Sequence, residues 1–278
     1  MILYKDLVIV TAAIESQTIY AFKKETGEEV WRQQAEGLDS TWSTPILVDV
    51  PGGATELVIA VPYELWGLNP ETGKLRWQCE TADSDSYCSS PVAHDGIVYV
   101  IEARGSGGAM AVRAGGKGDV TSSRVLWTKG DHGRISSPVY HDGRLYFVSG
   151  KIVRCLEAKT GDRVYQARLN SGGTDAAPIE EPPQDGGRRG GLGRHGGGRM
   201  GGQDYSSPVI SGDRMVYVTR GGEMYVVGLG PEFKQLALNH FSDDRSDYSA
   251  SPAISDGQLF IRSAKALYCV GETPKDAQ

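Results

Sequence analysis

Side chains that could bind a ligand gather just before five prolines. Four of these lead-in segments hold an aspartate followed by an aromatic residue, and serine hydroxyls come next. The residues concerned are Asp39, Trp42, Asp85, Tyr87, Asp204, Tyr205, Asp247, Tyr248, Ser89, Ser136 and Ser206. Carboxylates beside hydroxyls could bind a cation, a sugar-like polyol or a basic protein segment. The same aspartates could equally accept backbone hydrogen bonds at a turn, so both interpretations stay open.

Known catalytic signatures find little support in this chain. His94-Asp95 and His141-Asp142 have the composition of acid–base pairs, but they occupy a recurring turn in which SGD and SDG stand elsewhere. The string GLGRHG at 191–196 matches a dinucleotide fingerprint, yet it lies in Gly-rich sequence without the strand and helix that such a site needs. The four cysteines lack zinc-type spacing. We therefore assign no catalytic residue and no metal site.

The elements that must position the lead-in segments recur along the chain. Pro45, Pro91, Pro138, Pro208 and Pro252 are separated by 46, 47, 70 and 44 residues. Each is followed by a polar Gly turn between short alternating apolar runs, which is the signal of β-strands, and no segment shows helical periodicity. Four short strands in about 45 residues are typical of a propeller blade. We predict an all-β propeller of about six four-stranded blades, forming a single domain over residues 1–278.

The longest repeat holds a Gly- and Arg-rich insertion at 171–203. Its core, DGGRRGGLGRHGGGRMGG, is too rich in glycine to become ordered at low entropic cost, so we predict a flexible loop. Arg-Gly tracts can contact nucleic acid, but this one lacks interleaved aromatic residues for base stacking. We expect a solvated linker and no nucleic-acid partner; an acidic partner is the intermediate alternative.

The strand endings carry a family resemblance. YAFKKETGEEVW, ending at Trp31, and CLEAKTGDRVY, ending at Tyr165, resemble the pyrroloquinoline-quinone (PQQ)-like propeller repeats, especially those of extracytoplasmic proteins akin to the outer-membrane assembly factor BamB. The resemblance covers almost the whole chain except 171–203. It implies a non-catalytic scaffold for protein interaction or envelope assembly, a protein or envelope-polymer partner, and a periplasmic or envelope location.

The enzymatic branch of that superfamily provides the alternative function. PQQ-dependent dehydrogenases commonly hold the quinone with adjacent cysteines and a calcium ion, whereas the cysteines here are all separated. No Glu, Asn and Asp constellation for calcium and catalysis can be placed. We expect neither PQQ nor calcium. A divergent quinoprotein dehydrogenase, or a carbohydrate-active enzyme using the channel mouth, is the alternative to the scaffold.

Composition and cysteine placement set further expectations. The net charge of −6 does not indicate nucleic acid or an anionic membrane, and no stretch reaches the roughly 18 apolar residues of a membrane span. The amino terminus lacks a basic flank and long apolar segment of the signal-peptide type. We expect a monomer. Cys79 and Cys88, nine positions apart, could form a disulfide in an oxidising compartment, whereas Cys155 and Cys269 should stay reduced.

The two ends of the sequence read as incomplete repeats. The opening unit begins at MILYKDL, where a Ser-Pro strand should already be under way, and ALYCVGETPKDAQ stops before an aromatic fourth strand. Propellers avoid exposed edges by closing the ring. The pattern therefore favours a longer exported protein with a ring of seven or eight blades. The competing interpretation is a six-blade ring with one short blade.

Overall fold

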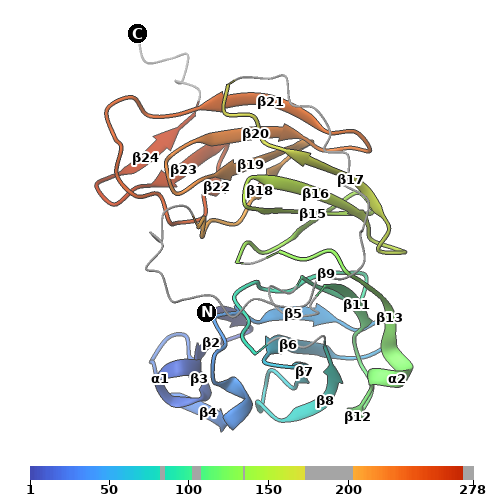
Figure 1. Ribbon diagram of the computed structural model, residues 1–278. Coiled ribbons are helices and arrows are strands. Elements are labelled where there is room, and N and C mark those ends of the chain that lie inside the picture. The colour runs from blue at the N-terminus through green and yellow to red at the C-terminus, as the bar shows by residue number, and fades with distance from the viewer. Residues whose placement is uncertain (82–84, 102–107, 134, 173–202, 272–278) are drawn as a thin grey trace, which may run out of the picture.

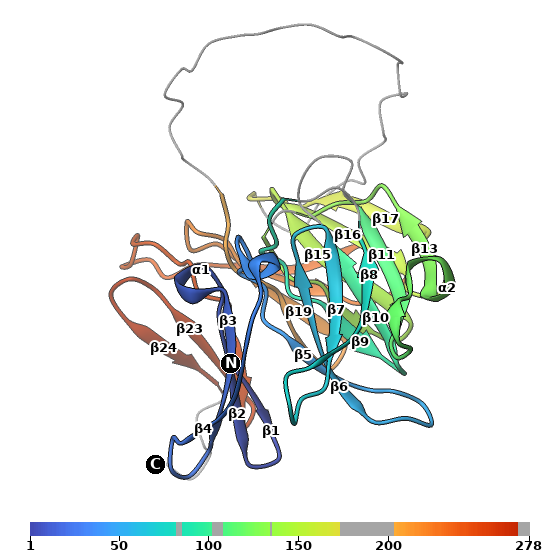
Figure 2. The same cartoon turned by 90° about the horizontal axis from the view of Figure 1, so that it is seen from below.

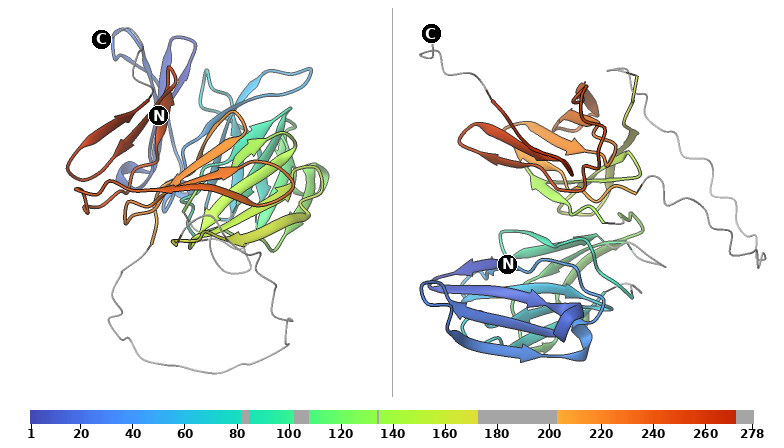
Figure 3. Two further views of the ribbon diagram at one scale, coloured as in Figure 1. Left: turned by 90° about the horizontal axis from the view of Figure 1, so that it is seen from above. Right: turned by 90° about the vertical axis from the view of Figure 1, so that its left-hand side faces the viewer.

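The computed structural model describes residues 1–81, 85–101, 108–133, 135–172 and 203–271 (Figure 1). These residues form six antiparallel sheets that follow one another in chain order, so the predicted all-β propeller is confirmed. Most of the predicted insertion at 171–203 lies outside the described residues. In the right-hand view of Figure 3 the blue and cyan strands of the first half lie below the orange and red strands of the second half.

The first three sheets have four antiparallel strands each, ordered from the axis outward. Sheet 1 contains β1 (Ile2–Tyr4), β2 (Leu7–Ala12), β3 (Thr18–Lys23) and β4 (Glu29–Gln34); sheet 2 contains β5 (Ile46–Asp49), β6 (Thr55–Val61), β7 (Glu64–Leu68) and β8 (Leu75–Glu80); and sheet 3 contains β9 (Val92–His94), β10 (Ile97–Ile101), β11 (Ala109–Arg113) and β13 (Val125–Lys129). The short β12 (Gly118–Asp119) pairs in parallel with the outer edge of β8.

The second half repeats the pattern. Sheet 4 contains β14 (Val139–His141), β15 (Arg144–Ser149), β16 (Ile152–Glu157) and β17 (Arg163–Arg168); sheet 5 contains β18 (Val209–Ser211), β19 (Arg214–Val218), β20 (Met224–Gly228) and β21 (Lys234–Asn239); and sheet 6 contains β22 (Ala253–Ser255), β23 (Gln258–Arg262) and β24 (Leu267–Val270). The helical turns are α1 (Ala13–Ser16), η1 (Glu36–Leu38) and α2 (Thr121–Arg124).

The recurring His-Asp-Gly strings are hairpin turns, as predicted. Asp95 and Gly96 have φ of 48° and 72°, and Asp142 and Gly143 have φ of 44° and 76°. Two successive positive φ angles are the requirement of a type I′ turn, which Asp-Gly meets at low steric cost. The His94 ring stacks on Tyr140, with ring centroids 4.1 Å apart. These histidines therefore belong to the turns rather than to an acid–base site.

The core lies between successive sheets, where hydrophobic clusters join each sheet to the next. The predicted aromatic wedges are present: Trp31 of β4 donates its indole N–H to the Pro70 carbonyl of sheet 2, 3.2 Å away. The Thr-Gly turn of that sheet packs on the same ring, because a Cβ on Gly73 would lie 2.6 Å from it. Gly161 and Trp127 repeat this arrangement between sheets 4 and 3. Only glycine fits between the turn and the ring.

One buried carboxylate supports the wedge between sheets 2 and 3. Trp77 of β8 is fully buried and donates its indole N–H to Glu56, at 2.6 Å. The same carboxylate accepts the backbone N–H of Gly115, at 3.0 Å, and lies 3.6 Å from Arg76. A buried carboxylate is stable only when its hydrogen bonds and charge are matched in this way. Glu56 is thus a structural residue.

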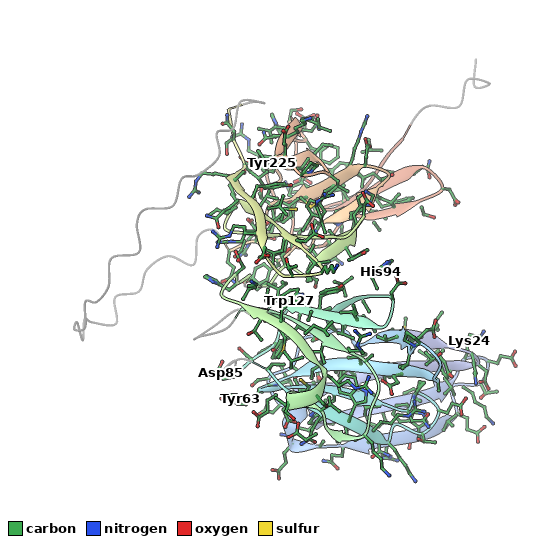
Figure 4. All side chains as sticks on the ribbon, turned by 90° about the vertical axis from the view of Figure 1, so that its right-hand side faces the viewer. Lys24, Tyr63, Asp85, His94, Trp127 and Tyr225 are labelled. Atoms are coloured by element: carbon green, nitrogen blue, oxygen red, sulfur yellow. The ribbon has the colours of Figure 1, made fainter. Side chains whose placement is uncertain are left out.

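The lead-in segments and the turns after the second strands share one end of the propeller. Figure 4 places Asp85, from a lead-in segment, and Tyr63, from the β6–β7 turn, at this end, whereas His94 and Lys24 lie at the other. Figure 2, which looks at the fold from a perpendicular direction, shows how the sheets fan around the axis. We call the end that carries the lead-in segments the lead-in end.

Candidate functional site

The residue before each proline links neighbouring sheets through a hydroxyl. The backbone N–H of this residue in one sheet donates to the side-chain hydroxyl of its counterpart in the next sheet. The links are Thr44 to Ser90 at 2.9 Å, Ser90 to Ser137 at 2.9 Å, Ser137 to Ser207 at 2.9 Å and Ser207 to Ser251 at 2.8 Å. We call this chain of contacts the hydroxyl relay. It explains the repeated Ser-Pro, because it joins sheets 2 to 6 near the axis.

Side chains alternate between buried and exposed along the lead-in segments, as expected for an extended chain. The aromatic residues four positions before the proline are buried: Tyr87 is 2% exposed and Tyr248 is 0% exposed. Those three positions before it face solvent: Trp42 is 56% and Tyr205 is 42% exposed. The eight aspartate and aromatic residues predicted from the sequence therefore separate into structural and surface residues.

The predicted serines lie inside the protein. Ser89, Ser136 and Ser206 are all buried, two positions before their prolines. The hydroxyls of Ser89 and Ser136 have no hydrogen-bond partner among the described residues, and Ser206 donates to the Ser207 carbonyl at 3.3 Å. Their neighbours, one position closer to the proline, make the relay contacts. The sequence analysis therefore selected the right segments, but the hydroxyls that link the sheets belong to the residues next to the serines it named.

A cavity of about 610 Å³ lies at the lead-in end over sheets 4 to 6. It brings together two predicted aspartates, Asp204 and Asp247, with residues of the β15–β16 and β19–β20 turns and with the two residues that precede Asp247. The remaining lining residues are Gly150, Lys151, Thr219, Arg220, Gly221, Glu223, Arg245 and Ser246. Asp39 and Asp85 are exposed and lie outside this set. We call the cavity the charged pocket.

Ion pairs organise the walls of the charged pocket. Lys151, from the β15–β16 turn, pairs with Glu223, from the β19–β20 turn. Burial lowers the pKa of Lys151, but the hydrogen bond to Glu223 and the Coulombic attraction of Tyr225, Glu223 and Asp204 together outweigh it, so this pKa is raised overall. Burial likewise raises the pKa of Glu223, but the hydrogen bonds from Lys151, Ser171 and Tyr225 and the charge of Lys151 together outweigh it, so this pKa is lowered overall. Both groups are therefore charged at neutral pH.

A second pair crosses from sheet 5 to sheet 6. Arg220 donates to Asp247, and its backbone N–H donates to the Asp204 carboxylate at 2.8 Å. The hydrogen bond from Ser249, followed by the one from Arg220, lowers the pKa of Asp247. The Arg220 guanidinium lies 5.5 Å from the centre of the exposed Tyr205 ring, which places a cation over an aromatic face. Asp204 and Asp247 thus position an arginine.

Arg245 is the exposed cation of the pocket. It lines the cavity, and no ion pair or hydrogen bond of its side chain is found within the described part of the chain. The pocket therefore holds three cations and three carboxylates, of which one guanidinium is open to a ligand. Guanidinium groups bind carboxylates and phosphates through paired hydrogen bonds.

Comparison with known proteins defines the family. The sequence profile described as "Outer membrane protein assembly factor BamB" matches residues 1–167, more than half of the chain. The chain belongs to the BamB family. No curated protein matches the sequence significantly.

Solved structures similar to this BamB-family chain are propellers of diverse origin. BamB from Moraxella catarrhalis has a TM-score of 0.63 at 13% identity, covering 96% of this chain and 70% of its own. Saccharomyces cerevisiae Sqt1 has a TM-score of 0.59 at 11% identity, covering 95% and 67%. The Myceliophteria thermophila Cps50 (Swd1) β-propeller domain has a TM-score of 0.57 at 10% identity, covering 95% and 78%. At these identities the likeness establishes the fold.

No disulfide joins the cysteines of this BamB-family chain in the structure, so the predicted Cys79–Cys88 bond is not formed there. Cys79 is buried in the outermost strand β8 and faces the core between sheets 2 and 3. Cys88 follows Tyr87, which bridges to Thr41 near the axis. Cys79 thus lies in the outermost strand of sheet 2, and Cys88 lies in the lead-in segment of sheet 3.

The sequence analysis did not predict several residues of the charged pocket. Lys151, Arg220 and Glu223 lie in turns after the second strand of their sheets, and the proline-centred repeat carries no signal for them. Within the described ranges, no group of three or more His, Cys, Asp or Glu side chains has a metal-binding arrangement. None of the helices in the described residues is long and apolar enough to cross a bilayer.

Proposed function

We propose that this BamB-family propeller is a non-catalytic scaffold that binds a protein partner in an extracytoplasmic compartment, using the charged pocket at its lead-in end. The observation that supports this most directly is that Arg220 and Arg245 line one cavity, with Arg220 paired to the exposed Tyr205 ring and the guanidinium of Arg245 open. Tyrosine and arginine are the residues most enriched at the energetic centres of protein interfaces.

The electrostatics of the pocket suit binding better than acid–base catalysis. A general base or acid is most effective when its pKa lies near neutral pH, which for a carboxylate requires a raised value. The pKa values of Glu223 and Asp247 are instead lowered by their hydrogen bonds and ion pairs. Both carboxylates hold cations in fixed positions, so the pocket has a preformed charge pattern that a partner can match.

The size of the pocket fits an anchoring side chain or a short segment. Its 610 Å³ lies within the roughly 300–1,000 Å³ of sites that bind small ligands. Arg245 offers paired donors to a carboxylate of the partner, and the Tyr205 ring provides apolar contact beside it. We therefore propose an acidic residue with adjacent apolar surface as the anchor. The extracytoplasmic location rests on membership of the BamB family, and we propose that binding requires neither PQQ nor calcium.

Site-specific photo-crosslinking tests the proposed scaffold. A photoreactive phenylalanine replaces Tyr205 in the full chain, and in a control it replaces Leu236, which is equally exposed but lies on the outer strand β21. The proposal expects one discrete protein adduct from position 205 in envelope extracts and none from position 236. Arg245→Glu should abolish the adduct, and Arg245→Lys should retain part of it. Equal adducts from both positions would contradict the proposal.

A direct assay distinguishes the scaffold from the quinoprotein alternative. The purified protein is incubated with PQQ and calcium and assayed for dye-linked oxidation of alcohols and sugars. We expect no activity above the level of a heat-denatured sample. Turnover that depends on both additives would refute the non-catalytic function.

A further inference from the structure

Sheet 6 differs from the other sheets at its outer edge (Figure 1). Within the described residues its order is β22-β23-β24, whereas sheets 1 to 5 each have a fourth strand on the outer side of the third. Leu267 of β24 is 67% exposed, and Cys269 and Val270 are exposed as well. We call the outer side of β24 the open edge. The proposed scaffold function makes no use of it.

The backbone of β24 presents hydrogen-bonding groups on this side. The hairpin between β23 and β24 begins with a bonded pair, in which the N–H of Ser263 donates to the Ala266 carbonyl at 2.8 Å. Residues of an antiparallel strand alternately face the partner strand and face away from it. Leu267 and Cys269, one and three positions beyond Ala266, therefore direct their N–H and C=O groups to the open edge. An added strand can pair with these groups.

The open edge lacks the protection that the other outer strands have. Natural sheets guard exposed edges with charged side chains or cover them with another element. The strands β4, β13, β17 and β21 each carry charged residues, and β8 is covered by β12. The sequence of β24, LYCV, holds no charge. An apolar edge of this kind favours pairing with a further strand.

The complete sheets define the register of such a strand. In sheets 1 to 5 the fourth strand is antiparallel to the third, and the register shifts directly after the same third-strand position. In chain order this position holds Ala21, Gly67, Ala111, Cys155 and Val226. The repeat places Cys269 at the equivalent point of β24. We therefore expect an antiparallel strand whose register shifts after Cys269.

The size of the third-strand residue at this position is matched by the residue opposite it. The small residues of sheets 1 to 4 lie opposite aromatic side chains, namely Trp31, Trp77, Trp127 and Tyr165. In sheet 5 the larger Val226 lies opposite Ala237. Close packing requires such compensation of volume. Cys269 matches Cys155, which lies opposite Tyr165, so it calls for an aromatic partner.

The described outer strands leave no aromatic residue for this position, because each of theirs already pairs within its own sheet. Residues 272–278, ETPKDAQ, contain no aromatic residue. We propose that the open edge of β24 binds an extended segment of a protein partner, antiparallel to β24, with a tyrosine or tryptophan opposite Cys269. This site lies beyond the proposed function, since no residue of β24 lines the charged pocket.

Titration with a strand peptide tests the proposal. The probe is fluorescein-labelled DRVYQAR, the sequence of residues 162–168, and its binding to the full chain is followed by fluorescence anisotropy. We expect saturable binding, and replacing the tyrosine of the peptide by alanine should weaken it about fivefold. The bound peptide should also slow alkylation of Cys269 and leave that of Cys88 unchanged. Absence of binding, or equal affinity of the two peptides, would overturn the proposal.

Backbone methylation of the peptide separates strand pairing from non-specific apolar contact. In sheet 4 the N–H of Glu157 donates to the Asp162 carbonyl, so Cys155, two positions earlier, also faces β17. The N–H of Tyr165 consequently points to the third strand, and that of Gln166 points away. N-methylation at the tyrosine should weaken binding at least about tenfold, whereas N-methylation at the glutamine should change it less than about threefold. Equal effects would contradict pairing with β24.

Variants of the exposed Cys269 test the matching of volumes. Cys269→Ala, which copies sheets 1 and 3, should retain affinity for the tyrosine peptide. Cys269→Val, which copies sheet 5, should weaken the tyrosine peptide about fivefold relative to the alanine peptide. Equal affinity of both variants for the tyrosine peptide would contradict the assignment. Arg245→Ala, in the charged pocket, should leave peptide binding unchanged, so the test is independent of the proposed scaffold function.

Sedimentation equilibrium distinguishes a partner segment from a second copy of the chain. We expect the full chain to remain monomeric at concentrations at which the peptide saturates it. A dimer that the peptide dissociates would show that a second copy covers the open edge, and it would overturn the assignment to a partner.

Discussion

Removing one hydroxyl of the relay should destabilise the propeller, whereas removing its neighbour should not. Ser137 accepts the backbone N–H of Ser90 from the adjacent sheet at 2.9 Å. Ser136, one position earlier, has a buried hydroxyl with no partner in the described residues. The two serines have the same chemistry and lie in the same segment. Ser137→Ala and Ser136→Ala therefore form a matched pair that isolates the inter-sheet hydrogen bond.

The magnitude follows from the surroundings of each hydroxyl. Ser137→Ala leaves the half-buried N–H of Ser90 without its acceptor, a net loss of about 1 kcal/mol in the free energy of unfolding. Ser136→Ala removes a polar group that is buried without compensation, so its effect should lie between neutrality and a gain of about 1 kcal/mol. For a domain of this size, 1 kcal/mol shifts the melting temperature by about 2–4 °C.

Equilibrium denaturation in urea, followed by fluorescence and circular dichroism, measures both changes. Coincidence of the two probes establishes that the unfolding free energy is well defined. Ser137→Thr is a further control, because threonine restores the hydroxyl that Thr44 carries at the equivalent position of sheet 2, and it should recover part of the loss. Equal destabilisation by Ser136→Ala and Ser137→Ala would refute the role of the relay.

Three further predictions concern buried polar groups. Glu56→Ala should lower the unfolding free energy by about 2–5 kcal/mol in urea denaturation, because an indole and a backbone N–H each lose their buried acceptor, and Glu56→Gln should cost less. Hydrogen bonds, first from Ser246 and then from Ser263, hold the pKa of Asp244 well below its usual 3.8. The Asp244 carboxylate therefore stabilises the fold fully above pH 3.8, and this stabilisation is lost as the pH falls below that value. Asp244→Asn should flatten the acid side of the curve of melting temperature against pH. Burial raises the pKa of Cys79 to about 11, so a thiol reagent at neutral pH should modify exposed Cys269 and leave Cys79 intact, as mass mapping will show.

The sequence was sufficient to predict the architecture because the propeller repeats its signals in register. The proline spacing located the innermost strands, and the Thr-Gly turns and following aromatic residues predicted the wedges between sheets. Trp31 and Gly73 show the physical reason: a ring on one sheet fills the space that the missing Cβ leaves on the next. Such contacts recur in each repeat, so a single sequence reveals them without comparison to relatives.

The candidate site was predicted only in part, because it depends on contacts that do not repeat. Asp204 and Asp247 were identified from their lead-in segments, but their partner Arg220 and the Lys151–Glu223 pair come from turns of variable sequence. Such side chains meet only after the sheets are stacked around the axis. The spacing of residues along the chain does not predict which side chains of neighbouring sheets come into contact.

Asp244 illustrates a second limit. It lies three residues before Asp247 and reads as another acidic group of the same loop. In the structure it is buried and accepts hydrogen bonds from Ser246, Ser263 and Tyr268, so it joins the lead-in segment to the last two strands of sheet 6. Asp247 faces the charged pocket. Two carboxylates in one loop thus have different functions, because the chain bends at Ser246, whose backbone N–H donates to Asp244, and Asp247 follows this bend.

The distance of a residue from the proline is the signal that separates structure from surface in the lead-in segments. The prolines are buried, and so are the described residues two and four positions before them, except Ala250 and Asp204, which are half-buried; the residue one before the proline enters the relay. The position three before the proline is exposed in sheets 2, 5 and 6 and half-buried in sheets 3 and 4. It holds Trp42, Cys88, Ile135, Tyr205 and Ser249 in sheets 2 to 6, five different residue types. Substitutions there can change what the lead-in end binds while the relay keeps the sheets in place, and the exposed Tyr205 ring beside Arg220 of the charged pocket is such a position.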